Sequence, residues 1–257
     1  GNYGGDGETQ PVPPEFLGKP FDHPDVKTAY ANYCRRVVEY FEPDFLAIGI
    51  EVNEIYPKGA EKWAAYLALH RHVYAELKAE HPDLPVFASF TLHNMLDWQG
   101  VPEDATIAAF DELMPTNDAV AVSFYPFIGG LSSRVDESFA WMTGHYDALS
   151  KPYVITETGE GAEELVFPST GQVIANTPEM QEAYYERLFA LAQERAFPFV
   201  ISFLYRDYDA LWDKIKDTSP EFFMAWRDCG LLDETGAARP AREVWRTYFD
   251  RPLSGER

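Results

Sequence analysis

The sequence predicts an α/β protein with parallel strands, and three observations support this fold class. Short apolar runs alternate along the chain with longer segments of helical periodicity. The apolar runs are near-continuous, which is typical of strands that are buried on both faces. Strands that alternate with helices are joined by right-handed crossovers into a parallel sheet. The chain is therefore expected to consist of repeated βα units.

Each element follows from its local pattern. Asp22-His23-Pro24 opens the first helix, while Thr177 caps a later helix that has Pro178 at its first position. The expected strands cover residues 45–52, 85–90, 119–124, 153–156 and 199–204. The expected helices cover residues 22–41, 60–79, 105–113, 136–149, 178–195 and 240–249.

Five strands suggest part of a larger architecture. A (β/α)₈ TIM barrel needs eight βα units, so the chain is expected to cover the last five, strands 4–8, with the first three missing. Residues 1–21, which are rich in Gly and Pro, read as a loop or linker, and residues 22–257 as the partial barrel. This pattern favours a fragment of a longer parent, with an open fold as the alternative.

Composition narrows the possible partners. The 257 residues carry a formal net charge of −21, which argues against binding to nucleic acid or to an anionic membrane surface. That charge favours a neutral or cationic ligand. Aromatic residues make up 15%, and aromatic side chains beyond the needs of the core often line grooves for the apolar faces of sugars. We expect a monomer that binds carbohydrate.

Two cysteines, Cys34 and Cys229, form neither a metal motif nor a disulfide framework, and Cys34 is expected to be a buried thiol. No compact His/Asp/Glu ligand set is evident, so no metal and no cofactor are expected. No run is long enough to span a bilayer, and residues 1–7 do not form a signal peptide. A secreted parent that has lost its signal is compatible with this, and we expect an extracellular or periplasmic location.

Two carboxylates occupy the ends of otherwise apolar strands, where active sites of parallel α/β folds form. Side-chain alternation along 45–52 directs Glu51 into the barrel, with Glu54 as the second choice. Glu157 ends the strand at 153–156, and Glu160 in the following loop is its alternative. A pair of this kind suits glycosidic cleavage, in which one carboxylate attacks the anomeric carbon and the other protonates the leaving oxygen.

Other polar and aromatic residues lie near the same strand ends. Tyr125 is a candidate hydrogen-bond donor to the nucleophile, with a purely buried aromatic as the alternative. His93 and Asn94 are candidates for binding sugar hydroxyls, and Trp98 for stacking on a sugar ring.

The loop 205–209 begins with Tyr205 and Arg206, which are further candidates for substrate binding. This loop could bind substrate or a calcium ion, or form a salt bridge, and we favour the salt bridge.

The motifs resemble those of clan A glycoside hydrolases. Ile48-Gly49-Ile50-Glu51-Val52-Asn53 resembles the end of the fourth strand of that clan, and Ile155-Thr156-Glu157-Thr158-Gly159 its seventh-strand nucleophile motif. Ser123-Phe124-Tyr125-Pro126-Phe127 is similar to the sixth strand of arabinogalactan endo-β-1,4-galactanases. Cys229-Gly230-Leu231-Leu232-Asp233, followed by Pro240-Ala241 and Trp245, resembles the closing helix of such barrels.

This resemblance implies a retaining glycoside hydrolase that acts on a plant-type β-linked polysaccharide or oligosaccharide. Glu51 would be the acid/base, Glu157 the nucleophile and Tyr125 the partner of the nucleophile. The acid/base should have a raised pKa, which predicts a bell-shaped pH profile on the acidic side of neutrality.

One position departs from the clan pattern. Ile50 stands where the clan has an Asn that hydrogen-bonds the sugar 2-hydroxyl, and Asn53 is the candidate replacement. The departure motivates a second hypothesis, a non-catalytic glycan-binding barrel. A barrel enzyme of different chemistry is the third.

Overall fold

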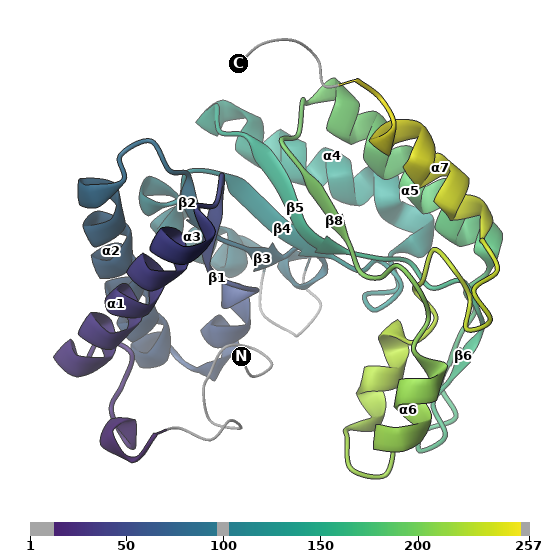
Figure 1. Cartoon of the computed structure of the whole chain (residues 1–257), viewed down its shortest axis with the longest axis horizontal. Helices are drawn as coiled ribbons and strands as arrows, with labels where there is room; N and C mark the ends of the chain where they lie inside the picture. Colours follow the sequence, from purple (N-terminus) through teal and green to yellow (C-terminus); the bar gives the residue numbers. More distant parts are fainter. Residues whose placement is uncertain (1–12, 97–102, 253–257) are drawn as a thin grey trace. The chain divides into compact units, whose positions relative to one another are not determined.

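The computed structural model describes residues 13–96 and 103–252 (Figure 1). The expected α/β architecture with parallel strands is confirmed. Strand β1 (Leu46–Gly49) pairs in parallel with β2 (Val86–Ala88), and β3 (Phe90–Thr91) pairs in parallel with β4 (Val120–Phe124). A four-stranded sheet has the order β3-β4-β5-β8, where β5 is Tyr153–Thr158 and β8 is Val200–Ser202. Among the described residues these strands do not close into a barrel.

The chain divides into two compact units. Unit 1 contains residues 1–123 and 146–156, and unit 2 contains residues 124–145 and 157–257. The division falls within β4 and β5, so that the carboxyl ends of both strands belong to unit 2. Every contact described below lies within one unit.

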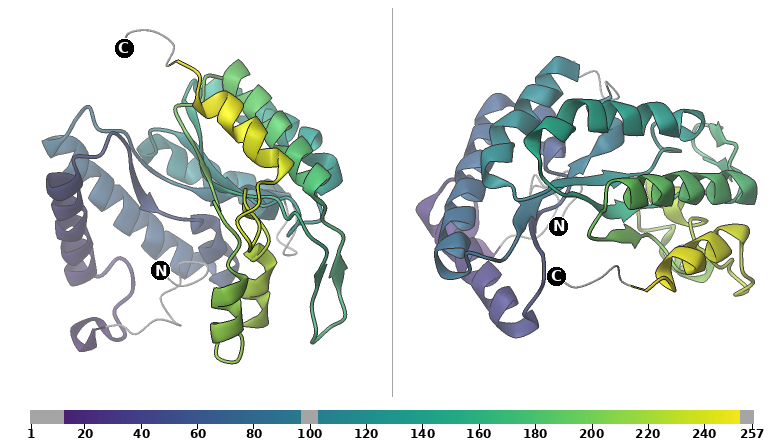
Figure 2. Two further views of the ribbon diagram at one scale, coloured as in Figure 1. Left: turned by 45° about the vertical axis from the view of Figure 1, so that its right-hand side comes forward. Right: turned by 90° about the horizontal axis from the view of Figure 1, so that it is seen from above.

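In unit 1, helices α1 (Pro24–Phe41) and α2 (Ala60–Glu80) lie side by side and pack against β1 (Figures 1 and 2). His23 caps α1 as the chain enters it, since its Nδ1 accepts a hydrogen bond from the backbone N–H of Asp25 at 3.1 Å. Helix α3 (Glu103–Leu113) follows β3. The buried core between α1, α2 and the two strands consists of Ala31, Cys34, Val38, Leu46, Ile48, Leu69, Val73, Leu77 and Val86.

A buried amide joins β2 to the start of β4. The Nδ2 of Asn117 donates to the carbonyls of Ala88 at 3.0 Å and Ala119 at 2.9 Å, and its Oδ1 accepts from the N–H of Ala88 at 2.6 Å. The side chain thus satisfies backbone groups that the short strand β2 leaves unpaired.

In unit 2, α5 (Pro178–Glu194) and α7 (Pro240–Phe249) lie side by side (Figure 2). Phe189 packs on Trp245 and on Tyr248, with ring centroids 5.0 Å and 4.8 Å apart. Thr177 caps α5 as predicted, because its Oγ1 accepts from the N–H of Met180 at 3.2 Å.

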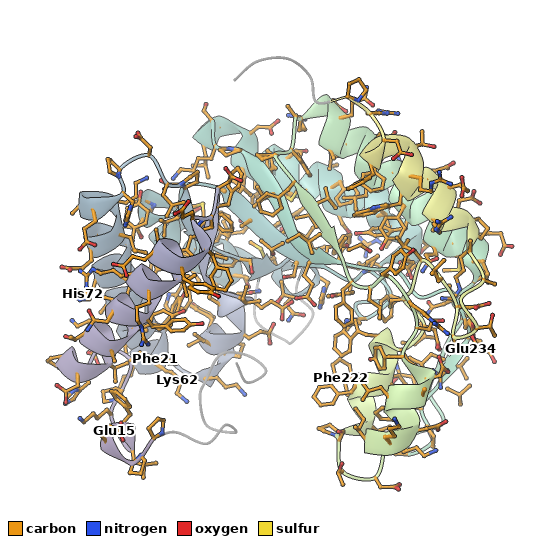
Figure 3. The ribbon with its side chains drawn as sticks, in the orientation of Figure 1. Glu15, Phe21, Lys62, His72, Phe222 and Glu234 are labelled. Carbon is orange, nitrogen blue, oxygen red and sulfur yellow. The ribbon has the colours of Figure 1, made fainter. Side chains whose placement is uncertain are left out.

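Unit 2 also carries segments that the hydrophobic pattern did not predict. These are the hairpin β6 (Leu165–Val166) and β7 (Val173–Ile174), the short helix α6 (Asp209–Ile215) and the 3₁₀ helix η8 (Glu221–Trp226). Phe222 of η8 is 43% exposed (Figure 3). Buried beneath these segments are Tyr125, Phe127, Leu165, Phe167, Trp212, Met224, Ala225 and Cys229.

Several predicted boundaries differ from the structure. The single strand expected over 85–90 is divided between β2 and β3, which belong to different sheets, and β8 is shorter than the expected 199–204. The strand expected over 45–52 ends at Gly49, and the helix expected over 136–149 is α4 (Val135–Tyr146) followed by a 3₁₀ turn over Asp147–Leu149. Within the described residues, no helix combines the length and apolarity needed to cross a bilayer.

Candidate active site

Glu157 lies one residue before the carboxyl end of β5. The preceding residues Tyr153, Val154 and Ile155 are buried, and the strand becomes partly exposed at Thr156 and Glu157. An apolar strand therefore carries a carboxylate near its carboxyl end, where the strand becomes partly exposed to solvent. The expected strand-end position of Glu157 is observed, and its role as nucleophile stays a prediction.

Tyr125 directly follows β4, and its phenolic O–H donates a hydrogen bond to Oε1 of Glu157. The tyrosine is buried, and its ring meets Phe127 and Trp226 edge to face, with centroids 6.1 Å and 5.7 Å away. These contacts hold the phenol in one orientation. The donor is thus aimed at the carboxylate by packing and the pair forms a pre-arranged unit.

Thr158 fixes the backbone on the other side of Glu157. Its Oγ1 donates to the carbonyl of Phe124 at 2.6 Å and also contacts the Tyr184 hydroxyl on α5. Its own carbonyl accepts from the N–H of Phe203 at 2.6 Å. The ends of β4 and β5, the chain after β8 and one helix therefore converge on the residue after Glu157.

Gly159 leaves no room for a side chain. A Cβ at this position would lie 2.3 Å from the carbonyl oxygen of Phe203 and 3.3 Å from a ring carbon of Tyr125. We expect Gly159→Ala to destabilise the protein by about 1–3 kcal/mol, since backbone must shift to relieve the overlap. Urea unfolding measures this change.

Gly144 on α4 provides the matched control. A Cβ there meets nothing within 4 Å, so Gly144→Ala should stabilise the helix by about 0.5–1 kcal/mol. Equal effects of the two substitutions would contradict the packing described around Gly159.

The alternative carboxylate, Glu160, is 1% exposed. Both of its oxygens accept from the hydroxyl of Ser132, at 3.0 and 3.1 Å. Burial raises the pKa of this carboxyl to about 8, so it is neutral at physiological pH. A buried, neutral carboxyl is a poor nucleophile, and the geometry favours Glu157 in that role.

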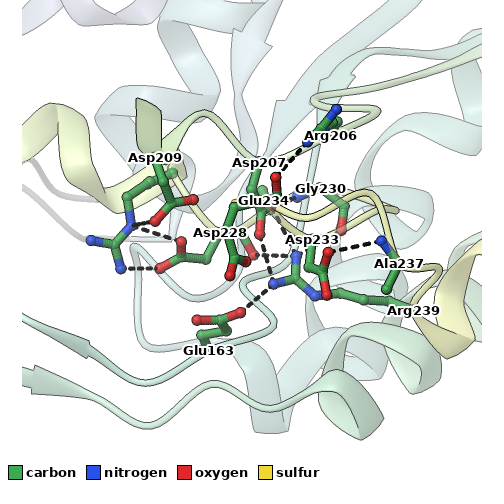
Figure 4. A network of polar contacts seen from close by, with 12 residues as sticks. Glu163, Arg206, Asp207, Asp209, Asp228, Gly230, Asp233, Glu234, Ala237 and Arg239 are labelled. Atoms are coloured by element: carbon green, nitrogen blue, oxygen red, sulfur yellow. Dashed lines mark hydrogen bonds and ion pairs between the residues drawn. The ribbon is translucent and has the colours of Figure 1, made fainter. Parts of the chain in front are cut away.

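The loop after β8 forms the salt bridge that was favoured for it (Figure 4). Asp207 has a fully buried side chain, accepts from the N–H of Gly230 at 2.7 Å and pairs with Arg239 at 2.7 Å. Burial raises the pKa of Asp207 to about 6, an effect that Arg239 opposes. Arg239 also reaches Glu163 at 2.5 Å. This network ties the loop after β5 to the loop after β8.

Tyr205 and Arg206, the two predicted substrate-binding residues of this loop, have different surroundings. Tyr205 is exposed, and Arg206 donates to the carbonyl of Glu234 at 2.5 Å. Their role in binding stays a prediction.

Two sets of three carboxylates in unit 2 lie close enough together to hold a cation, and sequence spacing did not reveal them. They are Glu163, Asp207 and Glu234, and Asp207, Asp209 and Asp228. Each set already has an arginine partner, since Arg239 pairs with Asp207 and Glu163, and Arg227 with Asp209 and Asp228. The donor set therefore fits an ion-pair network better than a metal ion.

Glu51 follows β1 in unit 1 but is not part of that strand. Its backbone is left-handed, with φ 53° and ψ 44°. The hydroxyl of Ser89 accepts from the N–H of Glu51 at 3.0 Å, and the Ser89 carbonyl accepts from Val52 at 2.9 Å. These bonds turn the chain into the 3₁₀ helix η3 (Val52–Lys58). The parity argument for Glu51 was therefore wrong, although the side chain is half-buried at the strand end.

The other predicted residues of unit 1 gather where η3 meets the segment after β3. Asn53 is buried, donating to the carbonyl of Thr91 at 3.1 Å and accepting from its N–H at 2.8 Å. Asn94 donates to Oε1 of Glu54. Burial lowers the pKa of His93 to about 3, so its imidazole is neutral. Asn53 thus joins η3 to β3, and Asn94 joins the 3₁₀ helix η4 (Leu92–Met95) to η3.

Two further predictions concern single residues. Trp98 lies outside the described residues. Ile50, at the position where the clan motif has Asn, is 53% exposed. The structure thus places Tyr125 with Glu157 in unit 2, and Glu51, Asn53, His93 and Asn94 in unit 1.

No protein-family model and no curated protein matches the sequence. Solved structures of glycoside hydrolases with TIM-barrel folds do match the structure. A Bifidobacterium dentium β-glucuronidase, complexed with coumarin-3-O-glucuronide, has a TM-score of 0.61 at 17% identity over 91% of this chain. The GH53 catalytic domain of Ignisphaera aggregans has a TM-score of 0.61 at 17% identity over 92%. A Formosa endo-laminarinase has 0.57 at 16% over 89%.

These proteins are longer than the chain. The match covers 35% of the β-glucuronidase, 65% of the endo-laminarinase and 68% of the GH53 domain. At these identities the similarity establishes the fold alone, an α/β arrangement of parallel strands shared with part of those barrels. It leaves the reaction to be argued from the site.

Proposed function

We propose that the chain is the part of a retaining β-glycoside hydrolase that carries the nucleophile Glu157. The observation that supports this most is the Tyr125–Glu157 pair at the ends of β4 and β5. A carboxylate held by a buried phenol at the edge of a parallel sheet can present an oxygen to an anomeric carbon. The fold shared with glycoside hydrolases provides the second line of support.

The proposed reaction is a double displacement. Glu157 attacks the anomeric carbon and forms a glycosyl ester while the bond to the leaving oxygen breaks and a second carboxyl gives that oxygen a proton. In the second step this second carboxyl group, now a carboxylate, takes a proton from water. The water oxygen attacks the anomeric carbon, and the bond to Glu157 breaks. Two inversions restore the original configuration.

Glu51 is the proposed acid/base, and Glu54 is the alternative. Both are half-buried at the start of η3. Glu54 already accepts from Asn94. The alignment of the motif with the clan pattern supports Glu51. However, Ile50 stands next to it in place of the Asn whose amide would bind the sugar 2-hydroxyl.

The proposed substrate is a neutral β-linked polysaccharide or oligosaccharide of plant type, degraded outside the cell. The net charge of −21 disfavours a polyanionic glycan. The segment from Ser123 to Phe127 is similar to a galactanase motif, which makes β-1,4-galactan the first substrate to test.

The experiment is product release, followed by the anomeric configuration of the product. The protein is incubated with β-1,4-galactan, laminarin and an aryl β-glucuronide, and proton NMR records the first anomer formed. The proposal expects the β-anomer to appear before mutarotation. Initial release of the α-anomer would contradict a retaining mechanism.

Ile50 supports one second candidate, a glycan-binding barrel without catalysis. Its exposed apolar side chain stands where a hydrogen-bonding amide is expected. Binding of galactan or laminarin by calorimetry, with no product after prolonged incubation, would favour this candidate over hydrolysis.

A further inference from the structure

A second pair of side chains joins the loops that carry Tyr125 and Glu157. Ser132, in the loop after β4, donates to both oxygens of Glu160, in the loop after β5. Glu160 follows Glu157 by three residues and is almost completely buried. The two loops are thus connected once through Tyr125 and Glu157 and once more through Ser132 and Glu160.

The loop after β4 is a compact turn that links Ser132 to Tyr125. The N–H of Ile128 donates to the carbonyl of Tyr125 at 3.1 Å, and the N–H of Leu131 donates to the carbonyl of Pro126 at 2.7 Å. Backbone bonds therefore hold the segment between the two side chains. The turn that carries Ser132 is thus connected by backbone hydrogen bonds to the tyrosine that donates to Glu157.

The loop after β5 is equally constrained. Nε2 of Gln181 lies within hydrogen-bonding distance of the carbonyls of Glu160, Cys229 and Gly230, at 3.0, 3.2 and 3.1 Å. A Cβ on Gly161 would lie 2.0 Å from the amide nitrogen of Asn176. Since the backbone of Glu160 is held in this way, the side chain cannot turn toward solvent without opening the loop.

The surroundings of the Glu160 carboxyl are neutral. The titratable groups that face it are the hydroxyls of Tyr184 and Tyr185 on α5 and the thiol of Cys229, and burial raises the pKa of each above its usual range. Among the described residues, no cationic side chain contributes to the pKa of Glu160. Ser132 and a backbone N–H are the groups that favour its charged form.

We propose that Glu160 is a positioning residue for the Tyr125–Glu157 pair: its neutral carboxyl fastens the loop after β5 to Ser132, and loss of its proton at alkaline pH loosens this connection. The proposal rests on the proposed function, because it assigns a consequence for catalysis. A carboxylate at this position would accept a stronger hydrogen bond from Ser132, but the cost of burying its charge is the larger effect, and opening of the loop relieves that cost.

The first arm of the test concerns folding alone. The carboxyl keeps its proton to about pH 8 in the folded protein, against an ordinary value of 4.5 when unfolded. Between these values the unfolded state binds fewer protons, so the folding equilibrium constant falls as pH rises, by up to roughly tenfold per pH unit. Glu160→Gln, which keeps the shape of the neutral carboxyl, should remove this dependence.

Urea unfolding of wild type, Glu160→Gln and the control Glu164→Gln between pH 5 and 9 measures this difference. Glu164 is an exposed glutamate of the same loop, so its variant should keep the pH dependence of wild type. The folding equilibrium constant of Glu160→Gln is divided by that of wild type at each pH. If this ratio is the same from pH 5 to pH 9, the proposal is overturned.

The second arm measures kcat against pH with a dinitrophenyl β-glycoside, whose leaving group needs no proton. Wild type should lose activity reversibly near pH 8, whereas Glu160→Gln should stay active at higher pH. At pH 6 the kcat of Glu160→Gln should lie within about threefold of the wild-type value. Ser132→Ala, which removes the connection without changing charge, should lower kcat several-fold at pH 6 while changing KM less.

The outcomes of this arm separate the two proposals. Identical alkaline limits for wild type and Glu160→Gln would overturn the positioning role. If wild type hydrolyses none of the test glycosides, the proposed function and the catalytic consequence fail together, while unfolding still decides whether Glu160 is neutral. If Glu160→Gln does not fold, an unchanged kcat in Ser132→Ala would overturn the positioning role.

Discussion

Glu157→Gln is expected to lower kcat on a β-linked substrate by about 10⁴-fold or more, with the free energy of unfolding within about 1 kcal/mol of wild type. An amide cannot form the glycosyl ester, whereas its oxygen can still accept from Tyr125 at the same position. The loss should therefore be chemical rather than structural. Reducing-sugar release and urea unfolding measure the two quantities on the same preparations.

Glu164→Gln serves as the control for this substitution, since it removes the same charge from an exposed position a few residues away. It should leave kcat unchanged. Turnover by Glu157→Gln at the wild-type rate would remove Glu157 from the mechanism, and the proposal of a double displacement would fail with it.

The second large effect concerns the acid/base. We expect Glu51→Gln to lower kcat/KM on a glycan about 10²–10⁴-fold and to have a much smaller effect on kcat/KM for a dinitrophenyl glycoside. Proton donation is needed for a sugar leaving group and is unnecessary for an acidic phenol. Steady-state kinetics on the two substrates reveal this contrast.

Glu54→Gln is the matched comparison, because Glu54 lies in η3, the 3₁₀ helix that begins directly after Glu51, and accepts a hydrogen bond from Asn94. It should affect both substrates equally and only moderately. If Glu54→Gln rather than Glu51→Gln lowers kcat/KM on the glycan much more than on the dinitrophenyl glycoside, Glu54 is the acid/base and Glu51 is not.

The sequence predicted the scaffold well because scaffold elements follow from local periodicity. The helix expected over 60–79 is α2 (Ala60–Glu80), and Thr177 caps α5 through the N–H of Met180 as its sequence position suggests. The strand-end position of Glu157 follows from the same patterns, whereas its contact with Tyr125, 32 positions away, was one of two alternatives that the sequence left open. In such elements each residue's neighbours along the chain determine its conformation.

Where distant residues compete for the backbone, the sequence was less informative. The Ser89 hydroxyl accepts a hydrogen bond from the N–H of Glu51, and β1 ends three residues earlier than the apolar run suggested. No periodicity encodes a hydrogen bond between residues 38 positions apart. The parity argument therefore failed at the residue for which it was needed.

The environments of the acidic residues in unit 2 depended on tertiary structure in the same way. The sequence predicted Glu160 as a loop residue, yet it is almost completely buried. Ser132 donates to its carboxyl group and Gln181 to its backbone carbonyl. The loop 205–209 was expected to form a salt bridge, but the partner of its Asp207 is Arg239, which lies 32 residues away and could not be named from spacing.

The central claim is that Glu157 forms the covalent intermediate, and trapping that intermediate tests it most directly. The protein is incubated at pH 6 with the dinitrophenyl 2-deoxy-2-fluoro-β-galactoside and its gluco counterpart, digested, and examined by mass spectrometry. The account predicts a fluoroglycosyl adduct on the peptide that contains Glu157, and none in Glu157→Gln. An adduct that peptide fragmentation places on Glu51 or Glu160 instead of Glu157, or turnover of a natural glycan with no adduct from either probe, would contradict it.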